Sequence, residues 1–278
     1  MSAQLPQGTR LAFDRGGTIF VATYPNTGGA VRVGQGQDPS ISADGKRVAF
    51  EESTRGKDRT FCIRDAATGR LIKRHVGTMP HFSPDGKRIA FSLFSGTRWT
   101  LWISDLALIA PRKITGSGED DPAFCSGWTA NGFLVAYSGQ VGGGLYALHP
   151  DGSVMHKESI SAIAKERDVS IPFGCAWSDD LSRIAFEGAT DEAFVGSGEP
   201  MIGLYLYDFA TKKRRLLTPK GMSGGSPIWL DRNLLVFTSG HNTKRYTGSQ
   251  IQVLQVNTGA LCLLLPDASG IALARRGA

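Results

Sequence analysis

The sequence predicts an all-β fold, a six-bladed β-propeller of four-stranded antiparallel blades, from an internal repeat, its spacing and two complementary chain ends. The clearest copies of the repeat begin at Asp38 and Met79, and both contain a Ser-x-Asp-Gly-Lys-Arg turn. Each copy closes on an aromatic residue, and intervals of 37 to 51 residues separate these aromatics: Phe13, Phe50, Phe91, Tyr137, Phe186 and Phe237. Such intervals are typical of propeller blades.

Each copy is interpreted as two strands joined by a tight turn. In the copy from Met79 to Phe91, an apolar segment leads to Asp85-Gly86, where glycine accepts the positive φ of the turn. The Arg-Ile-Ala-Phe segment that follows has the composition of a buried strand. We expect a third strand in each blade, at residues 19–21, 61–63, 101–103, 145–147, 204–206 and 251–253. Turn residues and a fourth, outer strand follow it.

The two ends of the chain complete one blade. The first copy of the repeat lacks an inner strand, and residues 269–275 have the apolar character to supply it. We therefore expect residues 269–275 to pair beside residues 9–14, which would hide a sheet edge that is otherwise unpaired. The prediction is a single domain over residues 1–278, with the ring closed by the C-terminal strand.

Composition and charge exclude two classes of protein. The chain has 35 glycines, 13 prolines and 41% hydrophobic residues, which suits many short strands joined by turns. It contains no apolar run of the ~20 residues needed to cross a bilayer, so we expect no membrane insertion. The net charge is +6, but the basic residues are dispersed rather than gathered in a stripe, so we expect no nucleic-acid partner.

The cysteines and the N-terminus are also informative. Cys62, Cys125, Cys175 and Cys262 lie far apart and lack metal-ligand spacing, so we expect free thiols and no metal site. The first residues show no charged segment followed by an apolar stretch, so we expect no signal peptide in this chain. The start at residues 2–4, Ser-Ala-Gln, is compatible with the remnant of a removed one.

The best copy of the repeat carries a family resemblance. Residues 82–91, then 101–106 and 113–115, resemble the TolB-like propeller repeat, a WD40-like repeat, almost residue for residue. The resemblance extends over nearly the whole chain in six unequal copies. We therefore expect neither the further N-terminal domain nor the hydrolase domain found in other proteins with this repeat. It implies a propeller of exported bacterial proteins, a protein-binding role and a periplasmic location; a cytoplasmic location stays open.

Loops on one face of the propeller are the expected binding surface. Blade-to-blade connections and loops between second and third strands share that face, and loops commonly carry function on a rigid scaffold. The longest loop is predicted over residues 188–201, followed by residues 240–249. Candidate partner-binding residues on these and the neighbouring loops are Arg55, Arg98, Trp99, Phe194, His241, Arg245 and Tyr246.

A second group of candidates lies at the predicted central channel. The inner strands and blade connections, one of them a short helical insertion over residues 159–168, bring five polar residues to it: Asp38, His81, Asp121, Arg167 and Asp168. His81 with Asp38 and Asp121 is a possible axial cluster, but a single histidine hydrogen-bonded to water is the simpler interpretation. The Gly-x-Ser-x-Gly motif at residues 221–225 lacks the helix that a nucleophile elbow needs.

These observations favour a noncatalytic binding module that engages a protein partner through its loop-rich face. We expect no catalytic residue and no cofactor. The alternative is a propeller enzyme, a lyase or hydrolase that acts on a polar small molecule at the central channel. A cation bound on the propeller axis would favour that alternative.

Overall fold

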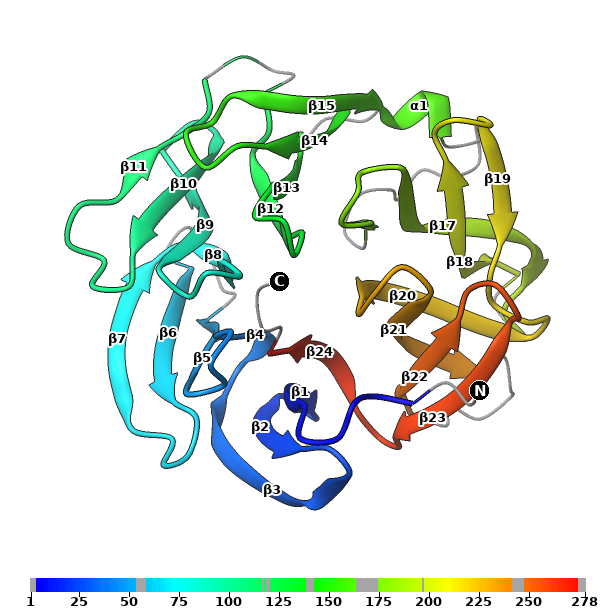
Figure 1. The fold of residues 1–278 in the computed structure, drawn as a ribbon, viewed down its shortest axis with the longest axis horizontal. Helices are drawn as coiled ribbons and strands as arrows, with labels where there is room; N and C mark the ends of the chain where they lie inside the picture. Colours follow the sequence, from blue (N-terminus) through cyan, green and yellow to red (C-terminus); the bar gives the residue numbers. More distant parts are fainter. Residues whose placement is uncertain are drawn as a thin grey trace. The chain divides into compact units, whose positions relative to one another are not determined.

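The computed structural model describes residues 4–53, 59–116, 118, 121–138, 143–163, 175–196, 198–241 and 248–274. Over these residues the strands form six four-stranded antiparallel sheets, accompanied by one short helix, α1 (Ile160–Ile163). Each sheet is one blade, so the fold is the predicted six-bladed β-propeller (Figure 1). The chain divides into two compact units, Pro6–Ser159 with Gly270–Ala278 and Met1–Leu5 with Ile160–Ser269. The single domain expected over residues 1–278 stays a prediction.

The larger unit holds four blades. The first, in the order of pairing, is β24 (Ser269–Leu273), β1 (Arg10–Arg15), β2 (Thr18–Thr23) and β3 (Asn26–Gln35). The second is β4 (Gln37–Ile41), β5 (Arg47–Ser53), β6 (Thr60–Asp65) and β7 (Leu71–Val76). The third is β8 (Thr78–Phe82), β9 (Arg88–Phe94), β10 (Trp99–Asp105) and β11 (Arg112–Lys113). The fourth is β12 (Phe124–Trp128), β13 (Leu134–Tyr137), β14 (Gly144–Leu148) and β15 (Val154–Ser159).

The C-terminal strand closes the first blade. β24 lies beside β1, which Figure 1 shows as a red strand next to a blue one. Just past β24, the backbone N–H of Ala274 donates to the carbonyl of Arg10 at 2.9 Å. The predicted pairing of the C-terminal segment with residues 9–14 is therefore confirmed for its described part, residues 269–274.

The smaller unit holds two blades. One is β16 (Cys175–Trp177), β17 (Arg183–Ala193), β18 (Pro200–Asp208) and β19 (Lys213–Leu216). The other is β20 (Met222–Trp229), β21 (Leu234–His241), β22 (Gln250–Gln255) and β23 (Ala260–Leu265). Ser223 of the Gly-x-Ser-x-Gly motif pairs with Gly240 within this second sheet, so the motif forms no nucleophile elbow.

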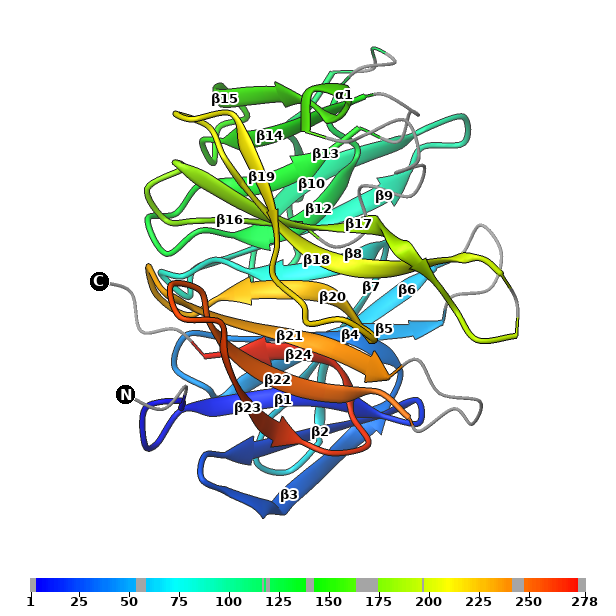
Figure 2. The ribbon, with the colours of Figure 1, turned by 90° about the vertical axis from the view of Figure 1, so that its right-hand side faces the viewer.

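One loop prediction is wrong. Residues 188–201 were expected to form a long loop, but most of them belong to the extended hairpin of β17 and β18 (Figure 2). Gly188 pairs with Gly203, and a register shift after Ala189 allows pairing to resume where Ala193 meets Pro200. The glycines and acidic residues of this segment give it the composition of a loop. Strand pairing nevertheless continues through it, because a β-bulge accommodates the shift in register.

The turn of the repeat is a hydrogen-bonded unit. The Ser83 hydroxyl donates to Asp85 and its oxygen accepts the backbone N–H of Arg88 at 3.0 Å. Ser178, Asp180 and Arg183 repeat this arrangement in another blade. Gly86 has a φ of 68°, as predicted from the turn type. The Ser-x-Asp pattern therefore corresponds to the hydrogen bonds that hold the first hairpin in three blades, at Ser42, Ser83 and Ser178.

The first strands of three blades share a bulge with a residue in left-handed conformation. Asp38, Met79 and Ser226 each precede a proline and have φ values of 52°, 52° and 49°. The bulged pair in each case lies opposite the closing aromatic of its own blade, because the register shifts there by one residue. The side chain of the bulged residue is re-aimed by this local change of direction.

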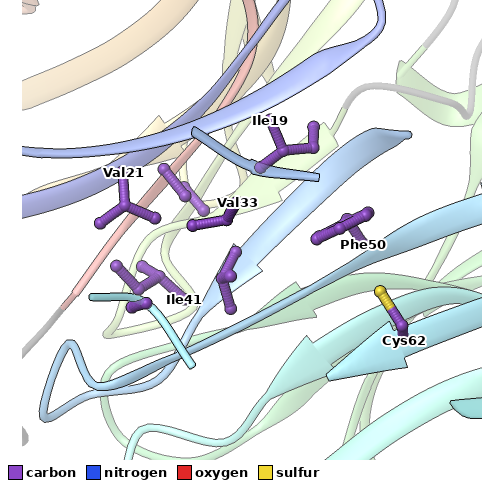
Figure 3. Packing of buried hydrophobic residues seen from close by; sticks show 10 residues of the cluster. Ile19, Val21, Val33, Ile41, Phe50 and Cys62 are labelled. Atoms are coloured by element: carbon purple, nitrogen blue, oxygen red, sulfur yellow. The ribbon is translucent and has the colours of Figure 1, made fainter. Parts of the chain in front are cut away.

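The core is built from the closing aromatics and their neighbours. Phe13, Phe50, Phe91, Tyr137, Phe186 and Phe237 are all buried, as the repeat predicts. Figure 3 shows one part of this core, where Ile19, Val21 and Val33 of the first blade meet Ile41, Phe50 and Cys62 of the second. All four cysteines are free thiols, as expected.

Candidate functional site

Three half-buried aromatic side chains form a continuous row in the larger unit. The rings of Phe94 and Trp99, on paired strands, have centroids 5.5 Å apart. Trp99 in turn lies 5.5 Å from Phe124 of the next blade, and Phe124 stacks on the buried Tyr137 at 5.2 Å. We call Phe94, Trp99 and Phe124 the aromatic shelf. It places apolar area at the end of the β9–β10 hairpin, on the loop side of these blades.

A positive charge lies against the shelf. The guanidinium carbon of Arg59 is 5.5 Å from the centroid of the Trp99 ring, the geometry of a cation–π interaction. Arg59 directly precedes β6, whereas Trp99 begins β10, so residues of two adjacent blades meet here. Arg98, next to Trp99, is exposed in the same hairpin turn. The structure thus combines a basic and an aromatic side chain where the sequence predicted a partner-binding surface.

Three carboxylates of the first two blades influence one another electrostatically, and we call Asp14, Asp38 and Glu51 the acidic cluster. Asp14 follows the closing aromatic of the first blade, and Glu51 follows that of the second. Asp38 occupies the bulge of β4, directly after Gln37, and Gln37 pairs with Glu51. The fold therefore brings together carboxylates that are far apart along the chain.

The ionisation of Asp38 reflects these neighbours. Its side chain is exposed, yet protein surrounds the carboxyl on most sides and limits its solvation. This loss of solvation, together with the negative charges of Glu51 and Asp14, raises the pKa of Asp38 to about 6. The Gln37 amide and the charge of Arg59 act in the opposite direction. Asp38 is consequently a carboxyl that changes charge close to neutral pH.

Glu51 is the buried member of the cluster, with 2% of its surface exposed. One oxygen, Oε1, accepts hydrogen bonds from the Thr78 hydroxyl and from the backbone N–H of Met79, the latter at 2.8 Å. The other oxygen, Oε2, is buried and has no hydrogen-bond partner among the residues that the structure describes. A buried carboxylate oxygen without a partner is costly, so this half of the side chain is a candidate for interaction with a positive charge.

The channel candidates His81 and Asp121 have other surroundings. The carbonyl of His81 accepts the indole N–H of Trp128 at 3.0 Å, and loss of solvation lowers the pKa of its imidazole to about 4. Asp121 Oδ2 accepts the N–H of Gly118 within its own loop at 2.9 Å. The structure thus shows separate partners for the two residues, and the axial cluster with Asp38 stays a prediction. Within the described ranges, no three metal-ligating side chains form a group that could hold a metal ion.

The remaining candidates are placed in part. Phe194 lies just beyond β17, where its N–H donates to the carbonyl of Glu199 at 2.9 Å and closes the tip of the long hairpin. His241 is the last residue of β21. Outside the described residues lie Arg55, Arg167, Asp168, Arg245 and Tyr246.

Sequence reasoning missed part of this site. Phe94, Phe124 and Glu51 were not among the candidate residues. A signal for Glu51 exists in the repeat, because an acidic residue follows the closing aromatic at Asp14, Glu51 and Glu187. Comparison of this position across blades would have singled out the carboxylates.

Comparisons with solved structures support the fold. TolB from Acinetobacter baumannii superimposes with a TM-score of 0.68 at 19% identity, over 96% of this chain and 67% of that one. A chain of the nidogen/laminin complex gives 0.66 at 14%, over 98% of this chain and all of that one. Puromycin hydrolase gives 0.54 at 15%, over 90% of this chain but only 42% of the enzyme. No family model and no curated protein matches the sequence.

These similarities concern the fold. The chain is a six-bladed β-propeller whose fold is similar to that of TolB. At identities below 20% the similarity extends to the fold alone, because propellers host many unrelated functions. The helix in the described part of the chain, α1, has four residues and is too short to cross a membrane.

Proposed function

We propose that the protein is a noncatalytic binding module that engages a protein partner through the loops around the aromatic shelf. The observation that carries this proposal is the row of Phe94, Trp99 and Phe124 with Arg59 over the indole. Aromatic and arginine side chains supply most of the energy at protein interfaces when a partner covers them. Their half-buried state leaves apolar area available while neighbouring rings hold them in place.

The comparisons are compatible with this function. One similar structure is a complex between nidogen and laminin, and another is TolB, whose family resemblance implies a protein-binding platform in exported bacterial proteins. We extend both properties to this chain as proposals: a protein partner, and a location in the periplasm. The other binding candidates, Phe194 at the hairpin tip and His241 at the end of β21, are proposed as secondary contacts.

The enzyme alternative has weaker support from the site. Puromycin hydrolase contains a propeller, but this chain spans less than half of that enzyme. The pKa of His81 is lowered to about 4, and a histidine of such low basicity takes up a proton only in acid. We therefore place the proposed function in recognition, with a polar small molecule at the channel as the alternative ligand.

Photocrosslinking tests the proposal directly. A photoreactive amino acid at position 98, exposed beside Trp99, should crosslink a specific protein in an extract of the source organism. The matched control is the same amino acid at position 154, which is exposed on the outer strand β15. The double variant Phe94→Ala, Trp99→Ala should weaken the crosslink at position 98 at least about tenfold, because hot-spot aromatics contribute roughly 2 kcal/mol each.

The folded state of the double variant is checked by its thermal melting in the same buffer. An equal crosslink from positions 98 and 154, or a crosslink at 98 that survives loss of both aromatics in a folded variant, would contradict the proposed surface. A hydrolytic or lyase activity lost in His81→Ala and retained in the double variant would favour the enzyme instead.

A further inference from the structure

We propose that the β17–β18 hairpin of one molecule docks on the aromatic shelf of a second copy of the same chain. This inference rests on the proposed function, because it names the partner that the shelf binds. It joins two surfaces of opposite charge on different blades: an acidic hairpin tip, and a row of aromatic rings bordered by arginine side chains.

The hairpin extends past the rest of its blade. Within the described ranges β17 and β18 contain 11 and 9 residues, whereas the corresponding strands of the other blades contain 4 to 8. Pairing with β16 ends at Phe186 and pairing with β19 ends at Tyr205, so the outer part of the hairpin projects from the sheet (Figure 2). A projecting element is able to meet a neighbouring molecule without rearrangement of its blade.

Hydrogen bonds within its own unit hold the hairpin in shape. The N–H of Phe194 donates to the carbonyl of Glu199 at 2.9 Å and closes the tip. Below the tip, Glu192 Oε2 accepts the backbone N–H of Gly221 at 2.9 Å, directly before β20. The base of the hairpin is thus tied to the neighbouring blade. A surface that is already ordered loses little conformational entropy when it binds.

The hairpin carries charge of one sign. Residues 184–211 include five acidic residues and no lysine or arginine, a net charge of −5 in a chain whose net charge is +6. Exposed side chains near the tip include the carboxylates of Asp191 and Glu199 and the apolar Val195, which is 49% exposed. Apolar area flanked by carboxylates is complementary to a surface that offers aromatic rings and cations.

The shelf offers such a surface at its Trp99 end. Residues 86–104, which include the β9–β10 hairpin, contain three basic residues and no acidic one. Arg98 is exposed beside Trp99, and the guanidinium of Arg59 lies over the indole ring. At the Phe124 end, the carboxylate of Asp121 accepts an N–H of its own loop. We therefore expect the acidic tip to approach the Trp99 end.

A second copy is the occupant that the charges favour. Every molecule carries both an acidic tip and a basic shelf, so the tip of one copy attracts the shelf of another. Two tips or two shelves would instead bring like charges together. The contact is heterologous, because two different surfaces of the chain meet. An acidic segment of a different protein is the other possible occupant, and the test distinguishes the two.

Sedimentation velocity of the purified protein tests the inference. From about 1 μM to about 0.5 mM, wild type should self-associate reversibly, and added salt should weaken the association. Two variants each remove one half of the contact. Phe94→Ala, Trp99→Ala removes the shelf, and Val195→Lys, Glu199→Gln removes the apolar and acidic groups of the tip. Each variant should weaken self-association at least about tenfold.

An equimolar mixture of the two variants gives the sharper comparison. Each variant keeps the surface that the other lacks, so the mixture should associate again as a heterodimer through one intact contact. The control is Val154→Lys, Met155→Lys, which changes the net charge by the same amount as the tip variant at exposed positions of β15. It should associate like wild type. Thermal melting shows whether each variant is folded.

The outcomes separate the inference from the proposed function. A monomeric wild type whose position 98 crosslinks a different protein overturns the inference and retains the binding surface. Self-association that is lost in the shelf variant but kept in the tip variant overturns it as well, because another part of the copy then covers the shelf. A mixture of folded variants that stays monomeric also overturns it. Absence of both self-association and a shelf-dependent crosslink overturns the inference together with the proposed function.

Discussion

The carboxylate of Glu51 accepts a 2.8 Å hydrogen bond from the backbone N–H of Met79, the bulged residue at the start of the next blade. Glu187 makes the same contact with the N–H of Ser226, also at 2.8 Å. Ser92 replaces the carboxylate in a third pair, where its hydroxyl accepts the N–H of Cys125 at 3.1 Å. The residue after a closing aromatic therefore joins its own blade to the following one in each unit.

Removal of this link should destabilise the protein. Glu51→Ala deletes the acceptor of the Met79 N–H and of the Thr78 hydroxyl, both in a buried setting. We expect a loss of about 2–3 kcal/mol in the free energy of unfolding, because buried donors are left unsatisfied. Glu187→Ala, which removes the acceptor of the Ser226 N–H, should cost roughly half as much. Urea unfolding of both variants measures the difference, and two equal or negligible losses would contradict it.

The glycine of the repeat turn should be required because of its backbone conformation, not because a larger side chain would collide with its neighbours. Gly86 has a φ of 68°, and apart from its two chain neighbours no described residue lies within 4 Å of a Cβ built on it. Gly86→Val should therefore destabilise by about 1–2 kcal/mol through backbone strain alone. Gly86→Asn provides the control, since asparagine tolerates left-handed φ and should cost clearly less. Equal melting temperatures for the two variants would show that strain at this turn is unimportant.

The closing strand should be essential for stability. Deletion of residues 269–278 removes β24 and exposes the edge of β1, together with the apolar positions that Ile271 and Leu273 fill. We expect a lower melting temperature and loss of soluble protein, because an unpaired edge invites association. A truncation after residue 274 keeps β24 whole and serves as the control. If the longer deletion melts like the control, the first blade is stable without its fourth strand.

Asp38 should make the stability depend on pH. The folded protein raises the pKa of Asp38 from the ordinary 3.8 to about 6, so it binds this proton more tightly than the unfolded chain does. The stabilisation from protonated Asp38 is thus complete below pH 3.8 and is lost as the pH rises through 6. Asp38→Asn removes the unfavourable charge, so it should be more stable than wild type near neutral pH, by on the order of 1 kcal/mol after screening by solvent.

The measurement for Asp38 is the free energy of unfolding of both proteins between about pH 4 and pH 7.5. The gap between variant and wild type should close as the pH falls, since both carry a neutral side chain in acid. A constant gap over this range, or a wild type more stable than the variant at neutral pH, would argue against a raised pKa for Asp38.

Much of the fold was predictable because each turn and each buried strand position of the repeat requires a particular type of residue. The Asp-Gly turn, the buried closing aromatic and the apolar strand after it each leave a residue type at a fixed position. Phe50 and Phe91 are buried as expected, and the glycine at position 86 adopts the positive φ that its turn demands. The partner strand for β1 could also be found, because a missing inner strand and a surplus apolar tail complement each other.

The site was less predictable because it depends on contacts between blades. The stacking of Phe94, Trp99 and Phe124 joins residues of two blades, and nothing in the local sequence specifies which side chains meet. The acidic cluster likewise depends on a register shift at Asp38 that re-aims the side chain. The extended β17–β18 hairpin was mistaken for a loop, because its pairing compensates for a composition that disfavours strands.

The pairing of β24 with β1 also has a consequence for biosynthesis. The N-terminal strands of the first blade leave the ribosome long before residues 269–273 have been synthesised. During this time β1 lacks β24, its neighbour on one side. Contacts between such distant parts of a chain carry a high loop-closure cost and slow the final folding step. The other five blades, each continuous in sequence, are able to form while synthesis is under way. Completion of the first blade must therefore wait until residues 269–273 have been synthesised, and a chain that stalls before them keeps an unpaired strand edge.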